Sequence, residues 1–307
     1  MDENFISNLP KCFVQNTLGM YGEAGEKWLI DLPQIVKEIA GNWSLKVENF
    51  FPNLSYNFVA PCVYASGDEV VLKIGFPEEN SLISNEARAL EIFGGNGAVK
   101  LLQSDEKLCA LLLEKAVPGE GLRKLCQRDD AAANQIAIDI MRRLWREPPE
   151  NQDFPTLESW IKGFEKAENS SFPAQTVKKA QSYFDELLDL SKNKFVLHGD
   201  LHHANILSAT REPFLAIDPK GIVGDIGYEI SVFLNNPRGW ILTQPDVRKI
   251  LRRRVEKFSE AFEIEPRDLR RWAFAEAVLS AWWTFEDNGT GWKKLARLRR
   301  ALGNINL

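Results

Sequence analysis

Residues 195–207 read FVLHGDLHHANIL, and after a turn residues 214–221 read FLAIDPKG. Apolar runs of three or four residues, bounded by Gly, Pro and Asn, are typical of short buried strands with loops at their ends. The polar loop between the first two runs contains all three histidines of the chain, together with Asp200 and Asn205. Loops held by buried strands tend to carry chemistry, so this segment is the first candidate for a functional site.

The spacing of three polar residues in this segment indicates phosphoryl transfer. Asn205 follows Asp200 by five positions, and Asp218 follows Asn205 by thirteen. In the kinase template a loop Asp accepts the proton of the substrate hydroxyl, and an Asn on the same loop binds Mg²⁺; a second Asp, past the next strand, binds metal that bridges the phosphates. Mg²⁺ prefers oxygen ligands, and one or two carboxylates with phosphate oxygens satisfy it. The template makes Asp200 the catalytic base and Asn205 and Asp218 the Mg²⁺ ligands.

The segment as a whole, HGDLHHAN followed by IDPKG, resembles the aminoglycoside phosphotransferase family, which shares the protein-kinase-like fold. The DPKG tetrapeptide, followed by Gly224-Asp225 and Glu229, is most similar to the branch of streptomycin 6-kinases and hydroxyurea kinases. The resemblance implies an α+β fold of two lobes, with a small antiparallel β-sheet in the N-terminal lobe and a larger, mainly helical C-terminal lobe. It also implies transfer of the γ-phosphate of ATP, with Mg²⁺, to a hydroxyl of an aminoglycoside or a related antibiotic or metabolite.

The histidines of the loop allow two interpretations. His198 and His202 are four positions apart, a spacing that binds zinc when both residues lie on one helix. Gly199 and Asp200 between them favour a loop instead, and the resemblance implies that both histidines brace this loop through hydrogen bonds. No role follows for His203, and Asp200 could itself serve only to cap or brace the loop.

Three short β-rich runs separated by turn residues predict a β-meander: residues 45–47, 58–65 and 70–74. Lys73 lies inside the third run, where a buried charge needs an anionic partner. By resemblance, Lys73 reaches the nucleotide phosphates and pairs with a helix glutamate, for which Glu86 is the first choice and Glu91 the alternative. A lysine at the strand edge that faces water is the simpler explanation of the same pattern.

The end of a later apolar strand predicts the boundary between the lobes. A continuous apolar run stops at Glu114, and a turn and helical sequence follow it. We therefore expect a nucleotide-binding lobe at residues 1–115 and a catalytic and acceptor-binding lobe at residues 116–307. By resemblance, backbone groups of Glu114, Lys115 and Ala116 hydrogen-bond the adenine edge.

Helical periodicity predicts most of the remaining elements. An amphipathic helix is expected around residues 28–39, with Pro33 as a kink or a restart. Further helices are expected at residues 84–91, 131–146, 157–167, 177–190, 247–262, 267–285 and 292–302. The basic run Arg248 to Arg254 is most simply the solvated face of one of these helices.

Acidic and aromatic residues late in the chain are candidates for the acceptor site. In the family, C-terminal acids of the large lobe bind the acceptor, which points to Asp225, Glu229, Glu286 and Asp287, with Trp283 beside the last two. Carboxylates attract a cation, and aromatic faces add cation–π stabilisation of about 0.5–2 kcal/mol. The expected acceptor is a small hydroxylated molecule with guanidinium or amino groups. Alternatively, these acids only solvate helix ends or pair with nearby arginines.

Composition narrows the class of protein. The formal net charge of −5 argues against a nucleic-acid-binding surface, which is normally basic. No apolar run approaches the length of a membrane span, no signal peptide is visible at the N-terminus, and the four scattered cysteines form no CxxC pair. We therefore expect a cytoplasmic protein without nucleic-acid or membrane partners, whose oligomeric state does not follow from the sequence.

Two other function classes fit parts of this pattern. A catalytically silent nucleotide-binding or regulatory protein could share the fold, but it would have no chemical need for Asp200, Asn205 and Asp218 together. A protein kinase would carry a D-F-G start and an A-P-E end on its activation segment, whereas this chain has Asp218-Pro219-Lys220 and no A-P-E. The sequence therefore favours a small-molecule kinase.

Overall fold

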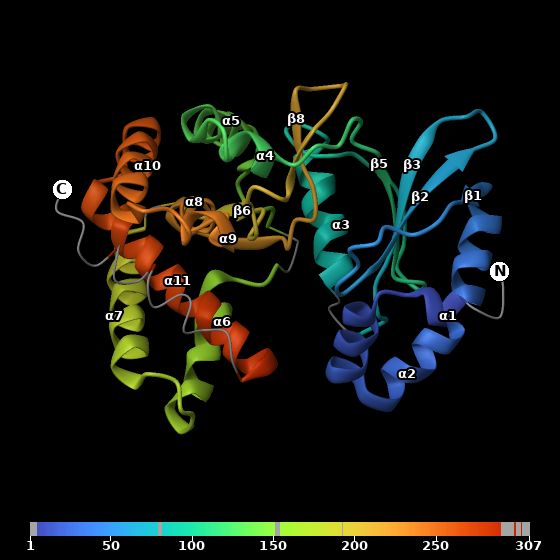
Figure 1. The fold of residues 1–307 in the computed structure, drawn as a ribbon, viewed down its shortest axis with the longest axis horizontal. Helices are drawn as coiled ribbons and strands as arrows, with labels where there is room; N and C mark the ends of the chain where they lie inside the picture. Colours follow the sequence, from blue (N-terminus) through green and yellow to red (C-terminus); the bar gives the residue numbers. More distant parts are fainter. Residues whose placement is uncertain are drawn as a thin grey trace. The chain divides into compact units, whose positions relative to one another are not determined.

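The computed structural model describes residues 5–78, 82–150, 154–191 and 193–289, together with Leu298 and Leu302. The chain divides into two compact units (Figure 1). The first consists of residues 1–95 and 99–116, and the second of residues 96–98 and 117–307. The sequence placed the division between residues 115 and 116, and it did not anticipate that the short segment 96–98 joins the second unit.

The first unit is built on a five-stranded antiparallel sheet with the strand order β1-β2-β3-β5-β4. Its strands are β1 (Leu45–Val47), β2 (Phe58–Tyr64), β3 (Glu69–Ile74), β4 (Leu101–Asp105) and β5 (Ala110–Glu114). Leu72 and Ile74 of β3 belong to the buried core of this unit, on the face of the sheet that α2 covers. Because side chains alternate along a strand, Lys73 points to the opposite face.

Helices cover both faces of this sheet; they are α1 (Phe5–Asn8), α2 (Lys11–Asn42) and α3 (Leu82–Phe93). Leu32 and Val36 of α2 pack in the core. On the other side α3 contacts β4 and β5 (Figure 1), and its Glu86 pairs with Lys73. The helix does not restart at Pro33, which lies inside α2, and its backbone leaves helical geometry instead at Gly22. Gly22 has a φ of +55°, which glycine adopts without the steric penalty of a Cβ atom.

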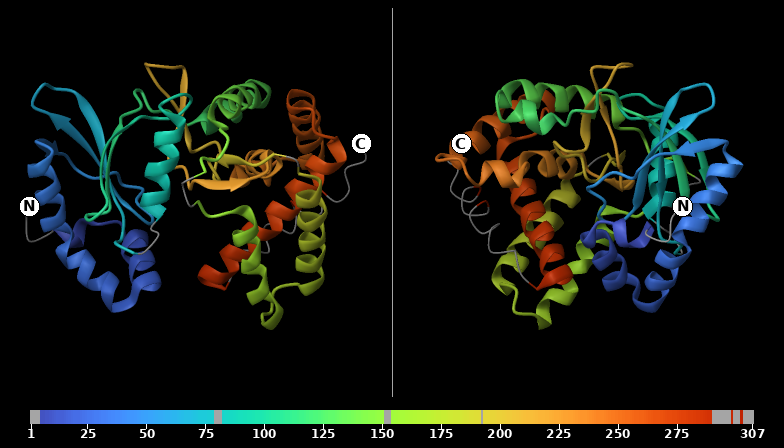
Figure 2. Two further views of the ribbon diagram at one scale, coloured as in Figure 1. Left: turned by 180° about the vertical axis from the view of Figure 1, so that it is seen from behind. Right: turned by 45° about the vertical axis from the view of Figure 1, so that its right-hand side comes forward.

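The second unit is mainly helical. Its helices are α4 (Leu122–Cys126), α5 (Asp130–Leu144), α6 (Leu157–Ile161), α7 (Ala174–Leu190), α8 (Ile226–Leu234), α9 (Arg238–Ile241), α10 (Val247–Phe262) and α11 (Pro266–Asn288). The helix expected at residues 157–167 is α6 followed by a 3₁₀ helix, Lys162–Asn169, and the one expected at 292–302 lies almost wholly outside the described residues. α11 runs alongside α7 and also packs on α8 (Figures 1 and 2). Among the helices of the described residues, none combines the length and apolar character needed to cross a bilayer.

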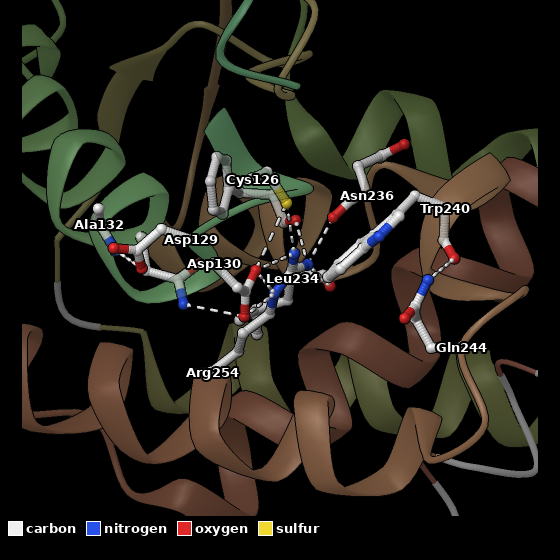
Figure 3. A network of polar contacts seen from close by, with 11 residues as sticks. Cys126, Asp129, Asp130, Ala132, Leu234, Asn236, Trp240, Gln244 and Arg254 are labelled. Atoms are coloured by element: carbon white, nitrogen blue, oxygen red, sulfur yellow. Dashed lines mark hydrogen bonds and ion pairs between the residues drawn. The ribbon is translucent and has the colours of Figure 1, made fainter. Parts of the chain in front are cut away.

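Arg254 of α10 is completely buried and ties three helices together (Figure 3). The sequence predicted a solvated face for the whole basic run; this holds for Arg253, which is exposed, and is wrong for Arg254. The guanidinium pairs with Asp130 of α5 at 2.6 Å and donates to the carbonyl of Leu234, at the end of α8, at 2.8 Å. A buried charge is tolerated here because carboxylate and carbonyl oxygens surround it.

The same cluster brings possible metal-ligating atoms of Cys126, Asp130 and His203 within 4.8 Å of one another. Arg254 Nη2 already lies 2.6 Å from Asp130 Oδ1 and 3.4 Å from Cys126 Sγ, so a metal ion would meet a fixed positive charge at close range. The His203 ring stacks on Phe233 with 3.9 Å between centroids, and burial holds its pKa well below the usual range. We assign the cluster to packing and to the support of the fold.

Candidate active site

The loop at residues 198–205 joins β6 (Phe195–Leu197) to β7 (Ile206–Ser208), and Asp218 lies between β8 (Phe214–Ala216) and β9 (Ile222–Gly224). β6 pairs with β9 and β7 with β8, both antiparallel. The N–H of Ile217 donates to the carbonyl of Asn205 at 2.9 Å, and the N–H of Lys220 donates to the carbonyl of His198 at 2.7 Å. The pairing therefore places the two polar segments of the sequence side by side.

Gly199 makes the first turn of this loop possible. Its φ is +81°, in the region that favours glycine. A Cβ atom here would lie 3.3 Å from both Lys220 Cβ and Trp160 Cη2. The turn and the close packing both require the absence of a side chain.

Glu229 of α8 stabilises the beginning of the loop through hydrogen bonds to its backbone. Its Oε1 accepts a hydrogen bond from the N–H of His198 and its Oε2 accepts one from the N–H of Gly199, each at 2.8 Å. Burial raises the pKa of this carboxyl to about 7; the two backbone N–H groups act in the opposite direction, and the charge of Asp200 raises it. Glu229 was expected at the acceptor, but its side chain is fully buried and both oxygens serve the backbone of the loop. We therefore assign Glu229 to the support of the loop and leave it out of the acceptor site.

His198 and His202 use their ring nitrogens within the loop. His198 Nε2 donates to the carbonyl of Ile217 at 2.9 Å, and its Nδ1 accepts from the N–H of Asp200 at 3.3 Å. Burial lowers the pKa of His198 to about 3, so the ring is neutral. His202 Nδ1 accepts from the N–H of Ala204 at 3.2 Å. Both histidines thus stabilise the loop through hydrogen bonds, as expected from the resemblance. Residues 198–205 form no helix, so the helical arrangement in which two histidines four positions apart bind zinc is not present here.

Asp200 presents a carboxylate that a substrate can reach. Its side chain is 35 % exposed, with Oδ1 3.8 Å from His202 Nε2. Burial raises the pKa of Asp200, whereas the charges of His202 and Lys220 lower it. Asn205 Nδ2 donates to the backbone carbonyl of Asp200 at 3.0 Å, which fixes the main chain and leaves the carboxylate to accept a proton.

Asn205 and Asp218 offer the hard oxygen atoms that suit Mg²⁺. The amide nitrogen of Asn205 donates a hydrogen bond to the backbone carbonyl of Asp200, and the amide oxygen, Oδ1, is the atom that can bind a cation. The Asp218 side chain is 33 % exposed, and its Oδ2 accepts from Lys220 Nζ at 2.9 Å. A positive charge therefore already lies at the carboxylate to which the sequence assigns a metal ion.

In the first unit, Lys73 of β3 pairs with Glu86 of α3, with 2.5 Å between Nζ and Oε2. The two residues are only 5 % and 3 % exposed, and the alternative partner Glu91 faces solvent. The partner of Lys73 is therefore Glu86, and Lys73 is not a strand-edge lysine that faces water.

The residues expected to bind the adenine edge lie at the end of β5. The Glu114 N–H donates to the carbonyl of Lys100 at 2.9 Å, and the Glu114 carboxylate accepts from the N–H of Lys100 at 3.0 Å. Lys115 forms an ion pair with Glu69, and Ala116 is the last residue of the first unit. The side chains of Glu114 and Lys115 thus make contacts inside this unit, so a role with the nucleotide rests on backbone groups.

Of the acids expected at the acceptor, Asp225 also has a local structural task. It caps α8 by accepting from the N–H of Gly227 at 2.7 Å, and it accepts from the hydroxyl of Ser191 at 2.6 Å. Burial raises its pKa. Glu286 lies 3.4 Å from Lys166, an ion pair at the surface, and the side chain of Asp287 lies outside the described part of the chain.

Trp160 of α6 is a residue at this site that sequence reasoning missed. It packs edge-on against Trp283 at 5.4 Å and against Tyr228 at 6.1 Å, measured between ring centroids. Its ring also lies against Gly199, the residue that precedes Asp200. Trp283 is thereby connected to the loop through Trp160, and the two rings provide an aromatic surface next to the proposed base. A single Trp in a short helix gives no sequence signal for such a place.

Comparison with solved structures shows which fold the chain has. The fold matches that of an aminoglycoside phosphotransferase solved in a ternary complex with ADP and hygromycin B, with a TM-score of 0.61 and 13 % identity, over 86 % of this chain and 97 % of that one. The expected protein-kinase-like fold of two lobes, with a small antiparallel sheet and a mainly helical second lobe, is confirmed.

Comparison of sequences shows the family. A sequence model of the aminoglycoside/hydroxyurea antibiotic resistance kinases matches residues 47–289, and the chain belongs to this family. It is 29 % identical to streptomycin 6-kinase of Streptomyces griseus, over 88 % of each chain. It is 28 % identical to hydroxyurea phosphotransferase of Kitasatospora aureofaciens, over 92 % of this chain and 82 % of the relative. The chain is an ATP-dependent small-molecule kinase, and nothing among these relatives favours the catalytically silent alternative.

Proposed function

We propose that this kinase transfers the γ-phosphate of ATP, with Mg²⁺ as the metal ion, to a hydroxyl of a small cationic antibiotic related to streptomycin. The observation that carries the proposal is the braced loop, in which the half-buried carboxylate of Asp200 lies within electrostatic reach of Asp218, and Asn205 bonds the backbone carbonyl of Asp200. The family and the names of the two relatives support the antibiotic class of acceptor.

Each residue has a defined task in this reaction. Asp200 accepts the proton of the acceptor hydroxyl as its oxygen attacks the γ-phosphorus. Asn205 and Asp218 hold Mg²⁺, which when bound offsets the negative charge of the phosphates. Lys73, kept in place by Glu86, binds phosphate oxygens. Positioning and charge neutralisation of this kind supply most of the catalysis in phosphoryl transfer.

Two further contacts complete the proposal. Backbone groups of Glu114, Lys115 and Ala116 bind the adenine edge, so their side chains can vary without loss of the nucleotide. The acceptor lies on the aromatic surface of Trp160 and Trp283, where a cation gains about 0.5–2 kcal/mol from each ring face. Of the acids considered for the acceptor, Glu286 and Asp287 follow Trp283 on α11 and are the ones we retain.

The test is an acceptor screen by ADP release in the presence of ATP and Mg²⁺, with streptomycin, hydroxyurea, anionic sugars and a blank without acceptor. We expect release that depends on a cationic hydroxylated acceptor, a product that carries one added phosphate, and loss of both in Asp200→Asn. The double variant Glu286→Gln, Asp287→Asn should raise KM for that acceptor and leave KM for ATP unchanged. Release that ignores the acceptor, or that persists in Asp200→Asn, contradicts the proposed function; an anionic best acceptor contradicts the cationic pocket.

A further inference from the structure

Lys220 has no task in the proposed function, although it contacts Asp218 and the beginning of the loop that carries Asp200. Its Nζ lies 2.9 Å from Asp218 Oδ2, and the two side chains are 26 % and 33 % exposed. The ion pair is therefore open to solvent on one side. A ligand that binds Asp218 meets the Lys220 ammonium at the same place.

The backbone of Lys220 is fixed, whereas the end of its side chain is not enclosed. Its N–H donates to the carbonyl of His198 at 2.7 Å, and its Cβ packs against Gly199, the residue before Asp200. From this fixed origin a flexible four-carbon stem carries the ammonium to Asp218. A side chain with a fixed backbone and a mobile ammonium group can move between two anionic partners.

The charge of Lys220 acts on both acids of the site. Burial raises the pKa of Asp200, and Lys220 is one of the positive charges that act against this effect. Lys220 also contacts Asp218 directly. It therefore lies within electrostatic reach of the proposed base and of the proposed metal ligand.

The ion pair and the proposed metal compete for the same carboxylate. A divalent cation on Oδ2 of Asp218 would repel the ammonium that lies 2.9 Å from that oxygen, and would displace it. The displaced ammonium needs another anion, and a phosphate group is the anion that the proposed reaction brings to this place. Lysine binds phosphate as a point charge, and the transition state of phosphoryl transfer spreads negative charge over three equatorial oxygens.

We propose that Lys220 is a further catalytic residue, which holds Asp218 in the nucleotide-free protein and moves to the transferred phosphoryl group in the reacting complex. The inference rests on the proposed function. A bond forms between the acceptor oxygen and the γ-phosphorus, and the bond from that phosphorus to the bridging oxygen breaks, its electron pair remaining on ADP. Asp200 receives the hydroxyl proton. Lys220 neither gives nor takes a proton; its charge offsets the charge on the equatorial oxygens.

A lysine that only keeps Asp218 in position would behave differently, and binding measurements separate the two roles. The probes are AMP-PNP with Mg²⁺, which resembles the ground state, and ADP with Mg²⁺ and aluminium fluoride, which resembles the transition state. Lys220→Met should lose roughly a hundredfold in affinity for the fluoride complex and much less for AMP-PNP. Its kcat should fall by a similar factor with little change in KM for ATP, and Lys220→Arg should recover part of both losses.

Lys124→Met is the matched control, because Lys124 of α4 is an exposed lysine of the same unit that pairs with Glu120. Thermal unfolding should show equal stability for both Met variants, and Lys220→Gln is the second neutral variant if Lys220→Met does not fold. Equal behaviour of Lys220→Met and Lys124→Met would overturn the proposal, as would equal losses for the two nucleotide complexes. If the wild-type protein itself has no acceptor-dependent activity and does not prefer the fluoride complex to ADP, the proposed function fails instead.

Discussion

The Oε2 atom of Glu229 accepts a hydrogen bond from the backbone N–H of Gly199 at 2.8 Å, so a buried acid of α8 directly holds the residue that precedes Asp200. Its Oε1 holds the N–H of His198 in the same way. An ionised carboxylate can accept both bonds, whereas a protonated one carries a hydrogen that opposes one of the two donors. The geometry of the loop therefore depends on the charge of Glu229.

The first prediction concerns the pH dependence that follows from this contact. Burial raises the pKa of Glu229 to about 7, so kcat should rise with pH through about 7 as the carboxylate ionises. Stability should change in the opposite direction, because a folded-state pKa above the usual 4.5 means that the folded protein binds the proton more tightly. The free energy of unfolding contributed by Glu229 is fully present below about pH 4.5 and is lost as pH rises through about 7.

Glu229→Gln provides the comparison for this prediction. The amide can accept only one of the two N–H groups, so kcat should fall roughly tenfold or more, and the rise of kcat near pH 7 should disappear. The measurements are a pH–rate profile and denaturant unfolding at several pH values for both proteins. An unchanged rise near pH 7 in Glu229→Gln would show that another group titrates there.

The second prediction concerns Lys73 and uses Lys46 as its control. Both are lysines of the same sheet, but Lys73 is buried and paired with Glu86, whereas Lys46 of β1 is exposed. Lys73→Ala should reduce kcat/KM for ATP strongly, and Lys46→Ala should leave it near the wild-type value. Steady-state kinetics with varied ATP decide the matter. Equal effects of the two substitutions would remove Lys73 from the nucleotide site.

The third prediction concerns the acceptor. Because Trp160 packs against both Gly199 and Trp283, Trp160→Ala should raise KM for the acceptor while KM for ATP stays the same. Trp160→Phe keeps an aromatic face and should recover much of the loss. A variant Trp160→Ala that binds its acceptor as the wild-type protein does would place the acceptor elsewhere.

The fourth prediction concerns stability. Arg254→Met leaves the carboxylate of Asp130 and several carbonyl groups without their buried partner, and the free energy of unfolding should fall by about 3–5 kcal/mol. Arg253→Met, one position earlier on the same helix and exposed, should change it by less than about 0.5 kcal/mol. Urea unfolding of the two variants measures the difference. Similar values would mean that solvent satisfies the groups around Arg254.

The strands and site residues that the sequence could predict are those with a local sequence pattern. Short apolar runs bounded by turn residues located β2, β3 and β6. The spacing of Asp200, Asn205 and Asp218 was informative because all three residues lie in loops at strand ends. The choice of Glu86 as the partner of Lys73 came from the resemblance to the family, applied to the helical sequence that follows the strand. In each case the determining contacts lie close together in the sequence.

Contacts between distant segments explain what the sequence could not predict. The place of Glu229 depends on the packing of α8 beneath β6, and an acid on a helix has no local pattern that separates a buried brace from a substrate ligand. Arg254 stands in a basic run that reads as solvated, and only the fold brings Asp130 to it from 124 positions earlier. Trp160 reaches the loop for the same reason.

The most direct test of the central claim is transfer of labelled γ-phosphate to the best acceptor of the screen by Asp200→Ala and Asp218→Ala. Asp200→Ala should bind ATP as the wild-type protein does and transfer phosphate about 10²–10⁴-fold more slowly, because only the proton acceptor is lost. Asp218→Ala should transfer none, because the oxygen ligand of Mg²⁺ is lost. Wild-type rates of transfer in either variant would contradict the assignment of these residues and the kinase mechanism built on them.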